Sequence, residues 1–194
     1  MRVPEEQDGL VVAALLAAGL GTRFRGREHK LMAGFRGAPL VSHALRAMRS
    51  SGIARRAVVA GPVELDDVLE DEVLLVNPDP ARGLASSLAI ARDWALAERA
   101  EALVIGLGDQ PLIPPSAWSR LASASGAPIM VATYQGKRRN PVRIAREAFD
   151  LLPESGDEGA RVLFSSYPTL VAEVECEGEP VDIDTVEELD EWNW

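Results

Sequence analysis

The sequence predicts a single-domain α/β protein, a three-layer sandwich in which helices cover both faces of a mostly parallel mixed sheet. Short apolar runs alternate along the chain with segments of helical periodicity, which is typical of parallel strands joined by helices. The first apolar run, residues 11–17, is unbroken and ends near glycine, as expected for a central strand covered on both faces. No repeat or low-complexity linker interrupts this pattern, so we expect one Rossmann-like domain.

The amino-terminal half predicts three strands and two helices. The apolar run 11–17 is the first strand, and short β-branched runs at 57–60 and 73–76 predict two more buried strands. Apolar residues recur at helical spacing in 40–48 and in 84–97, which predicts an amphipathic helix in each segment.

The carboxyl-terminal half continues the alternation. A strand is predicted at 102–106, a helix from Pro115 to about residue 124, and strands at 129–134 and 140–144. The remaining predicted elements are helical segments near 145–152 and 159–167, a half-exposed strand at 173–179, and a last helix that Thr185 caps and that runs to Trp192.

The domain is expected to span residues 10–194, after a flexible segment at 1–9. A chain of 194 residues that is 47% apolar can bury enough surface for a full core. The longest apolar stretch, 10–18, is far shorter than the roughly 20 residues of a membrane-spanning helix. Acidic residues stand where a secretory leader would be basic, which favours a cytoplasmic protein that contacts no membrane. Cys176 is the single cysteine, so a buried or idle thiol is expected.

Charge is distributed unevenly along the chain. The net charge is −10, and it comes from residues 173–194, which contain ten acidic residues and no Lys or Arg. The rest of the chain is neutral, with basic residues concentrated at 23–36 and 137–146. This pattern argues against a nucleic-acid partner and favours a small anionic ligand bound by local charge. Solvated surface is the alternative interpretation of either basic segment.

A glycine-rich loop follows the first predicted strand. Glycines at this place let backbone N–H groups approach a phosphate closely, and basic residues nearby supply the opposite charge. The loop matches neither the dinucleotide fingerprint nor the Walker pattern, because the residues that each requires are missing at the required spacing. A tight turn with incidental arginines is the alternative. The candidate binding residues are Leu16, Ala17, Ala18, Gly19 and Gly21, with Arg23 and Lys30 as the countercharges.

Acidic residues after two later segments suggest a metal site. Asp109 follows the strand predicted at 102–106, where a cation such as Mg²⁺ is held by one or two carboxylates and by substrate oxygens. Asp182 and Asp184 point to one side of an extended segment while Ile183 points to the other, so one of the two acids could complete the site. A turn aspartate and an acidic tail are the alternative interpretations.

Three further segments carry polar groups suited to a ligand. Gly83, Ser86 and Ser87 stand at a predicted helix start, where they offer room and donors for a base or a phosphate, although ordinary capping also explains the serines. Loops at 136–142 and 156–161 could grip a second substrate. We assign His29 and His43 to surface or packing, because neither has a partner at a meaningful spacing.

Taken in order, these motifs resemble the MobA-like nucleotidyltransferase family, and most closely its molybdenum cofactor cytidylyltransferase branch. The resemblance extends over roughly residues 10–191 and implies the nucleotidyltransferase type of the fold predicted above. The matching blocks are Leu16 to Gly19 with Gly21, Arg23, Gly26 and Lys30, followed by 37–40, 77–78, 83–88, 108–111, 140–142, 156–161 and 182–185.

The resemblance implies transfer of a nucleoside monophosphate from an NTP to a phosphorylated acceptor, with Mg²⁺ as cofactor and pyrophosphate as product. A phosphate nucleophile is already anionic at neutral pH, so the barrier is mostly charge repulsion and alignment, and no histidine base is needed. By the same resemblance, Ala18 favours CTP over GTP, and molybdopterin is the acceptor expected first. A cofactor-inserting chaperone or a target molybdoenzyme is a possible protein partner.

The resemblance also implies a role for each charged candidate. The residues from Gly19 to Gly21 and Arg23 would hold the NTP phosphates, and Lys30 would neutralise charge as pyrophosphate leaves. Asp109 would hold Mg²⁺ together with Asp182 or Asp184.

Two other functions remain open from the sequence. An NAD-dependent oxidoreductase could use a similar sheet, although the dinucleotide fingerprint is missing. A non-catalytic module could bind nucleotide and act with a cofactor-handling partner. The charge at Asp109 separates these hypotheses, because only the transferase requires it for pyrophosphate release.

Overall fold

A seven-stranded mixed sheet forms the centre of the structure, a computed structural model that describes residues 9–194. Its strand order is β5-β4-β1-β6-β8-β7-β9, and β8 runs antiparallel to both of its neighbours while the other pairings are parallel. The flexible segment expected at 1–9 lies outside the described residues except for Gly9. The strands are β1 (Val11–Ala17), β4 (Arg55–Ala60), β5 (Val73–Val76), β6 (Ala102–Leu107), β7 (Ile129–Tyr134), β8 (Lys137–Ala145) and β9 (Val171–Glu175).

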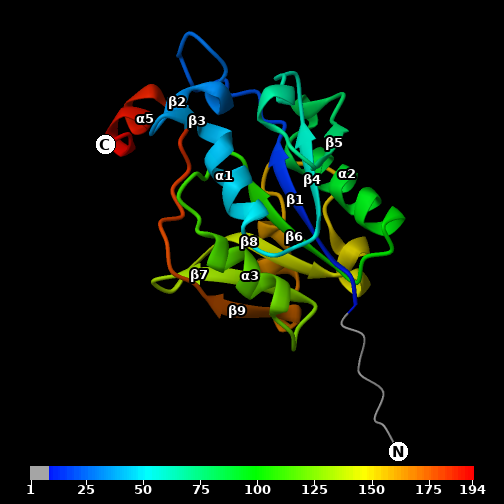
Figure 1. Cartoon of the computed structure of the whole chain (residues 1–194). Coiled ribbons are helices and arrows are strands. Elements are labelled where there is room, and N and C mark those ends of the chain that lie inside the picture. Colours follow the sequence, from blue (N-terminus) through cyan, green and yellow to red (C-terminus); the bar gives the residue numbers. More distant parts are fainter. Residues whose placement is uncertain (1–8) are drawn as a thin grey trace, which may run out of the picture.

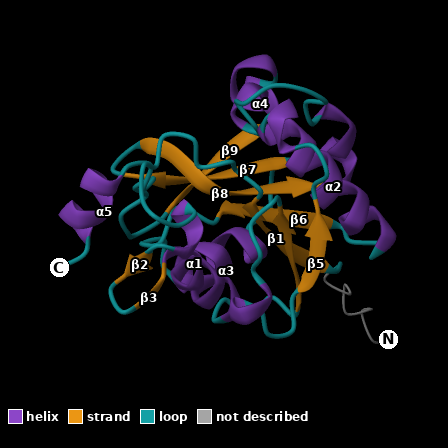
Figure 2. Ribbon diagram, turned by 90° about the horizontal axis from the view of Figure 1, so that it is seen from above, coloured by secondary structure: helices purple, strands orange, loops and turns teal. Residues whose placement is uncertain are grey.

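Helices cover both faces of the sheet, as Figure 2 shows from above. α1 (Leu40–Arg49) and α3 (Pro115–Ser123) pack on one face, and α2 (Leu84–Ala97) and α4 (Arg161–Ser166) pack on the other. Each face has its own apolar core, so the predicted single-domain, three-layer α/β fold is confirmed. None of the helices among the described residues is long and apolar enough to cross a membrane.

A third, smaller core lies beside the sheet, where the carboxyl-terminal helix returns to the segment that follows the glycine loop (Figure 1). Here α5 (Val186–Trp192) packs near a short hairpin of β2 (Gly34–Phe35) and β3 (Ala38–Pro39), and Ile183 is fully buried between them. The 3-10 helix η1 (Lys30–Met32) leads directly into this hairpin. The third core therefore brings residues 24–40 close to the acidic carboxyl-terminal segment.

Several elements differ from the sequence prediction. β5 was expected to be buried, but it is an edge strand whose Val73, Leu74 and Val76 are 44%, 39% and 65% exposed. The strand predicted at 140–144 is longer, because a turn at Gln135 and Gly136, both with positive φ, joins it to β7 as a hairpin.

The bounds of the last predicted strand also need correction. The strand expected at 173–179 is β9 at 171–175, because its register on β7 begins at Ile129↔Val171. The helical segment predicted near 145–152 is present as a 3-10 helix, η4 (Arg146–Leu151). The other short 3-10 helices are η2 (Asp66–Val68), η3 (Pro80–Arg82) and η5 (Pro168–Leu170).

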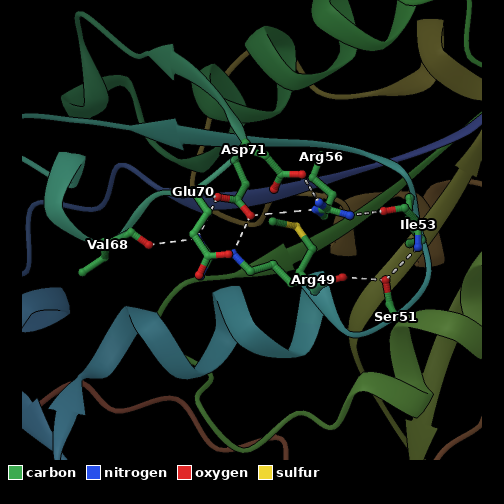
Figure 3. Close-up of polar contacts among 9 residues, drawn as sticks. Arg49, Ser51, Ile53, Arg56, Val68, Glu70 and Asp71 are labelled. Carbon is green, nitrogen blue, oxygen red and sulfur yellow. Dashed lines mark hydrogen bonds and ion pairs between the residues drawn. The ribbon is translucent and has the colours of Figure 1, made fainter.

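A buried ion-pair network ties α1 to the edge of the sheet (Figure 3). The Glu72 side chain is fully buried and accepts from Arg49 Nε at 2.6 Å and from Arg49 Nη2 at 2.7 Å. Arg56 Nη1 donates to the Ile53 carbonyl at 2.6 Å, and the Arg49 Nη2 group also reaches the Val68 carbonyl. Buried charges need partners of this kind, so the network fixes the loops on both sides of β4.

Candidate active site

A cleft of about 470 Å³ opens at the carboxyl ends of β1 and β6. The chain leaves these two adjacent strands in opposite directions along the sheet, and such a switch point is where open α/β sheets bind their ligands. The sequence-predicted residues that line the cleft are Leu16, Ala18, Gly19, Gly21, Arg23, Lys30, Gly83, Ser87, Asp109 and Asp184.

The glycine loop is shaped for close approach to a ligand. Gly21 has a φ of +60°, a conformation that favours glycine, and a side chain added at Gly19 would meet no atom within 4 Å. His29 connects this loop to η1. Its Nε2 lies 3.1 Å from the Gly19 carbonyl oxygen, and its Nδ1 accepts from the Leu31 N–H. These two bonds assign the proton to Nε2. His29 is thus a support of the loop, a role that the sequence did not reveal.

Lys30 lies at the centre of a charged cluster on the floor of the cleft. Its Nζ donates to Asp109 Oδ2 and to Asp184 Oδ1, both at 2.8 Å, and its side chain is only 9% exposed. Burial by itself lowers the pKa of Lys30, but the two carboxylates outweigh burial and hold the pKa above its ordinary value. Arg23, at the exposed rim, completes the cluster through Nη2 and Asp184 Oδ2 at 2.8 Å.

Asp182 lies next to this cluster but has a different partner. Its Oδ1 accepts from Gln110 Nε2 at 2.7 Å, and Gln110 Oε1 accepts from Asn140 Nδ2 at 3.1 Å. Burial raises the pKa of Asp182, and the negative charge of Asp109 raises it further. The amide of Gln110, which is 1% exposed, therefore connects the loop after β6 to β8 and to the acidic segment. This chain of polar contacts was not predicted.

The start of α2 forms the opposite wall of the cleft. Asn77 Nδ2 donates to Ser86 Oγ at 2.8 Å and to Ser87 Oγ at 2.9 Å, and Ser86 Oγ donates to the Gly83 carbonyl. Gly83 has a φ of +88°, and a Cβ there would lie 2.7 Å from the Gly156 carbonyl oxygen. The loop at 156–157 therefore closes directly over the helix start.

Two of the predicted binding residues face away from the cleft. The Ala17 side chain belongs to the apolar core below α1, because it points to the opposite side of the strand from Leu16 and Ala18. The Ser86 hydroxyl is buried and is used inside the protein. Ser86 thus shapes the wall, whereas Ser87 lines the cleft.

An adjoining cavity of about 360 Å³ shares Arg23, Asp109 and Asp184 with the cleft. Its other lining residues include Arg139 of β8 and, from α4, Arg161 and the apolar Phe164. The two spaces meet at the charged cluster, so a group bound in one faces a group bound in the other. This arrangement suits two anionic substrates that react with each other.

The charged cluster has the donor set of a divalent cation site. Two carboxylates, Asp109 and Asp184, already converge on one cationic atom, and Asp109 Oδ1 is a buried oxygen without a hydrogen-bond partner. Among residues 9–194, no group of three His, Cys, Asp or Glu side chains closes around a single point. Two carboxylates are sufficient for Mg²⁺, which takes its other ligands from water and substrate phosphates.

Known proteins share both the sequence pattern and the fold. Nicotine blue oxidoreductase of Paenarthrobacter nicotinovorans is 31% identical over 92% of this chain and 94% of its own length. Bifunctional protein GlmU of Bradyrhizobium sp. (strain ORS 278) is 35% identical over 62% of this chain, which matches only 28% of that protein.

Solved structures give the same result. The crystal structure of Rv0371c from Mycobacterium tuberculosis H37Rv superposes with a TM-score of 0.83 at 27% identity and covers 95% of this chain and 97% of that one. Another structure of Rv0371c, a complex with manganese, has a TM-score of 0.76 at 25% identity and covers 95% of this chain and 98% of that one. Residues 13–171 match the family model of the MobA-like NTP transferase domain, and the chain therefore belongs to the MobA-like NTP transferase family.

Proposed function

We propose that the protein is a Mg²⁺-dependent nucleotidyltransferase. It transfers a nucleoside monophosphate from an NTP to a phosphorylated acceptor and releases pyrophosphate, and CMP is the group that we propose first. The observation that carries this proposal is the position of the charged cluster. Lys30, Asp109 and Asp184 meet between the glycine loop and the adjoining cavity, at the point where two bound phosphates would face each other. Charge neutralisation and alignment are what phosphoryl-group chemistry requires of a protein.

The chain's own residues divide these tasks. The backbone N–H groups from Gly19 to Gly21 and the Arg23 guanidinium bind the triphosphate and orient it along the cleft. Lys30 neutralises the charge that develops on the leaving pyrophosphate. The nucleophile is an anionic phosphate, so no side chain has to remove a proton from it.

Asp109 and Asp184 are the residues that would hold Mg²⁺, with Asp182 as a further candidate at its side. The cation, when bound, supplies Lewis-acid stabilisation of charge on the transferring phosphate. The orphaned Oδ1 of Asp109 supports this assignment, because a shielded carboxylate oxygen without a partner costs free energy that a cation would offset. Manganese in the Rv0371c complex supports a divalent cation in this family.

The acceptor is proposed to bind in the adjoining cavity. Arg139 and Arg161 provide positive charge for its phosphate, and Phe164 provides an apolar surface for the rest of it. Molybdopterin has this combination of a phosphate and a fused ring system, and it is the acceptor that we propose first. On this hypothesis a cofactor-inserting chaperone or a target molybdoenzyme would take the product from the protein.

Thermal stability with CTP, GTP, ATP, UTP and NADH, each with and without Mg²⁺, tests the donor. A ligand at about 100 times its dissociation constant adds about 2.7 kcal/mol, which is readily seen as a shift in Tm. A shift with one NTP that requires Mg²⁺ would support the transferase and identify its donor. A flat response to every NTP would count against the proposal.

Pyrophosphate release then tests the chemistry. Arg23→Ala should reduce turnover about 10²- to 10³-fold, the effect of removing one preorganised donor. Arg25→Ala, a change in the same loop that does not line the cleft, is the matched control. Asp109→Asn should abolish release and leave nucleotide binding. A wild-type protein that binds NTP but releases no pyrophosphate with any acceptor would indicate the non-catalytic binding module.

An oxidoreductase is the second candidate, because one relative that matches nearly the whole chain is named nicotine blue oxidoreductase. On this hypothesis a reduced nicotinamide nucleotide would occupy the cleft and a reducible organic molecule would occupy the adjoining cavity. Stabilisation by NADH without Mg²⁺, together with NADH oxidation when a quinone-type dye is present, would favour this candidate over the transferase.

A further inference from the structure

A cavity of about 560 Å³ lies at the opposite edge of the sheet from the cleft, where β1 begins and β8 ends, and we call it the rear cavity. Its walls come from residues 9–11, from the segment 51–54 before β4, and from the end of α3 at 119–125. We propose that the rear cavity binds a small monocarboxylate with a compact apolar body, and that Arg143 holds the carboxylate. This site shares no residue with the cleft, so the proposal does not rest on the proposed function.

Arg143 is a half-buried arginine without an ion-pair partner among residues 9–194. Its Nε has no hydrogen bond and is closed off from solvent, and the described residues place no carboxylate within ion-pair distance of it. Its register partners on the neighbouring strands, Val104 and Met130, are apolar and buried. A guanidinium stays charged in a protein, so its partial burial without a carboxylate beside it costs free energy that a bound anion would offset.

A second arginine in the same protein shows the contrast. Burial lowers the pKa of Arg143, whereas the hydrogen bond with Glu72 raises the pKa of Arg49. Arg49 is also partly buried, but its guanidinium binds a carboxylate through two nitrogens. Arg143 lacks that carboxylate within the described chain. A ligand carboxylate bound at the terminal nitrogens of Arg143 would supply the missing negative charge.

Hydrogen bonds fix the walls of the rear cavity. Ser51 Oγ accepts from the Ile53 N–H, and Arg56 holds the Ile53 carbonyl from the other side (Figure 3). Ser119 Oγ donates to the Ser51 carbonyl at 2.7 Å, which ties α3 to the same segment. Because these groups satisfy one another, the space is preformed, as ligand sites usually are.

The lining determines the class of ligand. Arg143 is the only basic side chain among the described residues that line the rear cavity, and Glu101 lines it as well. One guanidinium beside a carboxylate suits a single negative charge better than a phosphate dianion. The wall residues Leu10, Ile53 and Ala122 are apolar, so the body of the ligand meets a surface that favours hydrocarbon.

Benzoate is the probe for this proposal, and the full chain is titrated with it by NMR and by calorimetry. We expect one saturable site, with amide shifts concentrated at 9–11, 51–54 and 119–125. Arg143→Met, which keeps the apolar stem and removes the charge, should weaken benzoate binding at least about tenfold. Arg120→Met, a change at an exposed arginine of α3 that does not line the rear cavity, should leave the affinity unchanged.

A second variant and two competitors make the test decisive. Ala122→Phe fills the rear cavity and should also abolish binding, which provides an independent test if Arg143→Met does not fold. Inorganic phosphate should bind more weakly than benzoate. The proposal is overturned if wild type shows no saturation, if Arg143→Met binds benzoate as tightly as wild type, or if CTP with Mg²⁺ competes with benzoate. If benzoate binds only after residues 1–8 are removed, the acidic amino terminus and not a ligand would be the partner of Arg143, and this result would also overturn the proposal.

Discussion

Replacing Lys30 by Met should destabilise the protein in the absence of divalent cations and should make its stability depend on Mg²⁺. Lys30 is the shared partner of Asp109 and Asp184, so its loss leaves two carboxylates close together with only the exposed Arg23 beside them. Removing one partner of a buried ion pair costs about 3 to 5 kcal/mol. The two carboxylates retain 23% and 20% exposure, so we expect the lower end of this range, about 3 kcal/mol.

This loss corresponds to a fall in Tm of roughly 6 to 12 °C for a chain of this size. Urea unfolding followed by tryptophan fluorescence, in a chelator and then in Mg²⁺, measures the free energy of unfolding and its dependence on the cation. Mg²⁺ should restore most of the lost stability in Lys30→Met, because a bound cation replaces the ammonium between the carboxylates.

The matched control is the double variant Lys30→Met with Asp184→Asn. It removes one of the two repelling charges, so it should be more stable in chelator than Lys30→Met alone and should respond less to Mg²⁺. If Lys30→Met is as stable as wild type in chelator, the ion-pair cluster does not hold the site together. If Mg²⁺ restores nothing, the two carboxylates do not form a cation site.

Three further outcomes follow from other parts of the structure. Glu72→Gln should lower the free energy of unfolding by about 3 kcal/mol, because it removes the buried carboxylate that pairs with Arg49 and leaves only the exposed Glu70 beside the guanidinium. Glu70→Gln, at a side chain that is 71% exposed, should lower it by under about 0.5 kcal/mol in the same urea titration. Burial lowers the pKa of His29 below its ordinary 6.5, so the unfolded chain takes up the proton more readily than the folded protein. The free energy of unfolding should therefore fall as the pH drops below about 6.5. His29→Gln should flatten that part of the pH profile. Gly83→Ala should weaken NTP binding and cost more than Gly126→Ala in thermal unfolding, since both glycines have positive φ but only at Gly83 would a Cβ meet another loop.

The local parts of the fold and of the site could be predicted from the sequence. β1 and α2 have the predicted bounds, because β1 is a continuous apolar run between glycines and α2 repeats apolar residues at helical spacing directly after Gly83. Thr185 caps α5 as expected, since its Oγ accepts from the Glu188 N–H and the Glu188 carboxylate accepts from the Thr185 N–H in return. The glycine loop and Asp109 meet because the carboxyl ends of adjacent parallel strands lie at one edge of the sheet.

Features that depend on distant contacts could not be predicted. An apolar run such as Val73–Val76 predicts a strand, but whether that strand is central or at an edge depends on the order of the whole sheet. The pairing of Lys30 with Asp184, 154 positions away, depends on the third core around Ile183. The sequence did not indicate that His29 supports the glycine loop, because its partner there is a backbone carbonyl.

The third core also explains why Asp184 and not Asp182 meets Lys30. Glu188 accepts from the Asp184 N–H at 2.7 Å as part of the start of α5, so the helix cap fixes the backbone of the residue that enters the cluster. The far end of the same helix is held to the β2–β3 hairpin, where Arg36 Nε donates to the Trp192 carbonyl at 3.0 Å. The hairpin directly follows the 3-10 helix of Lys30, so one small core sets the position of both partners.

The two candidate functions make different demands on this cluster of charges, although they are compatible with the same fold. Hydride transfer from a nicotinamide would leave Lys30 paired with Asp109 and Asp184, since that reaction has no need of a divalent cation. Nucleotidyl transfer requires the two carboxylates to accept a metal ion and Lys30 to turn toward phosphate. Asp184→Asn should therefore abolish Mg²⁺-dependent pyrophosphate release, whereas it should leave NADH oxidation intact if the protein is an oxidoreductase.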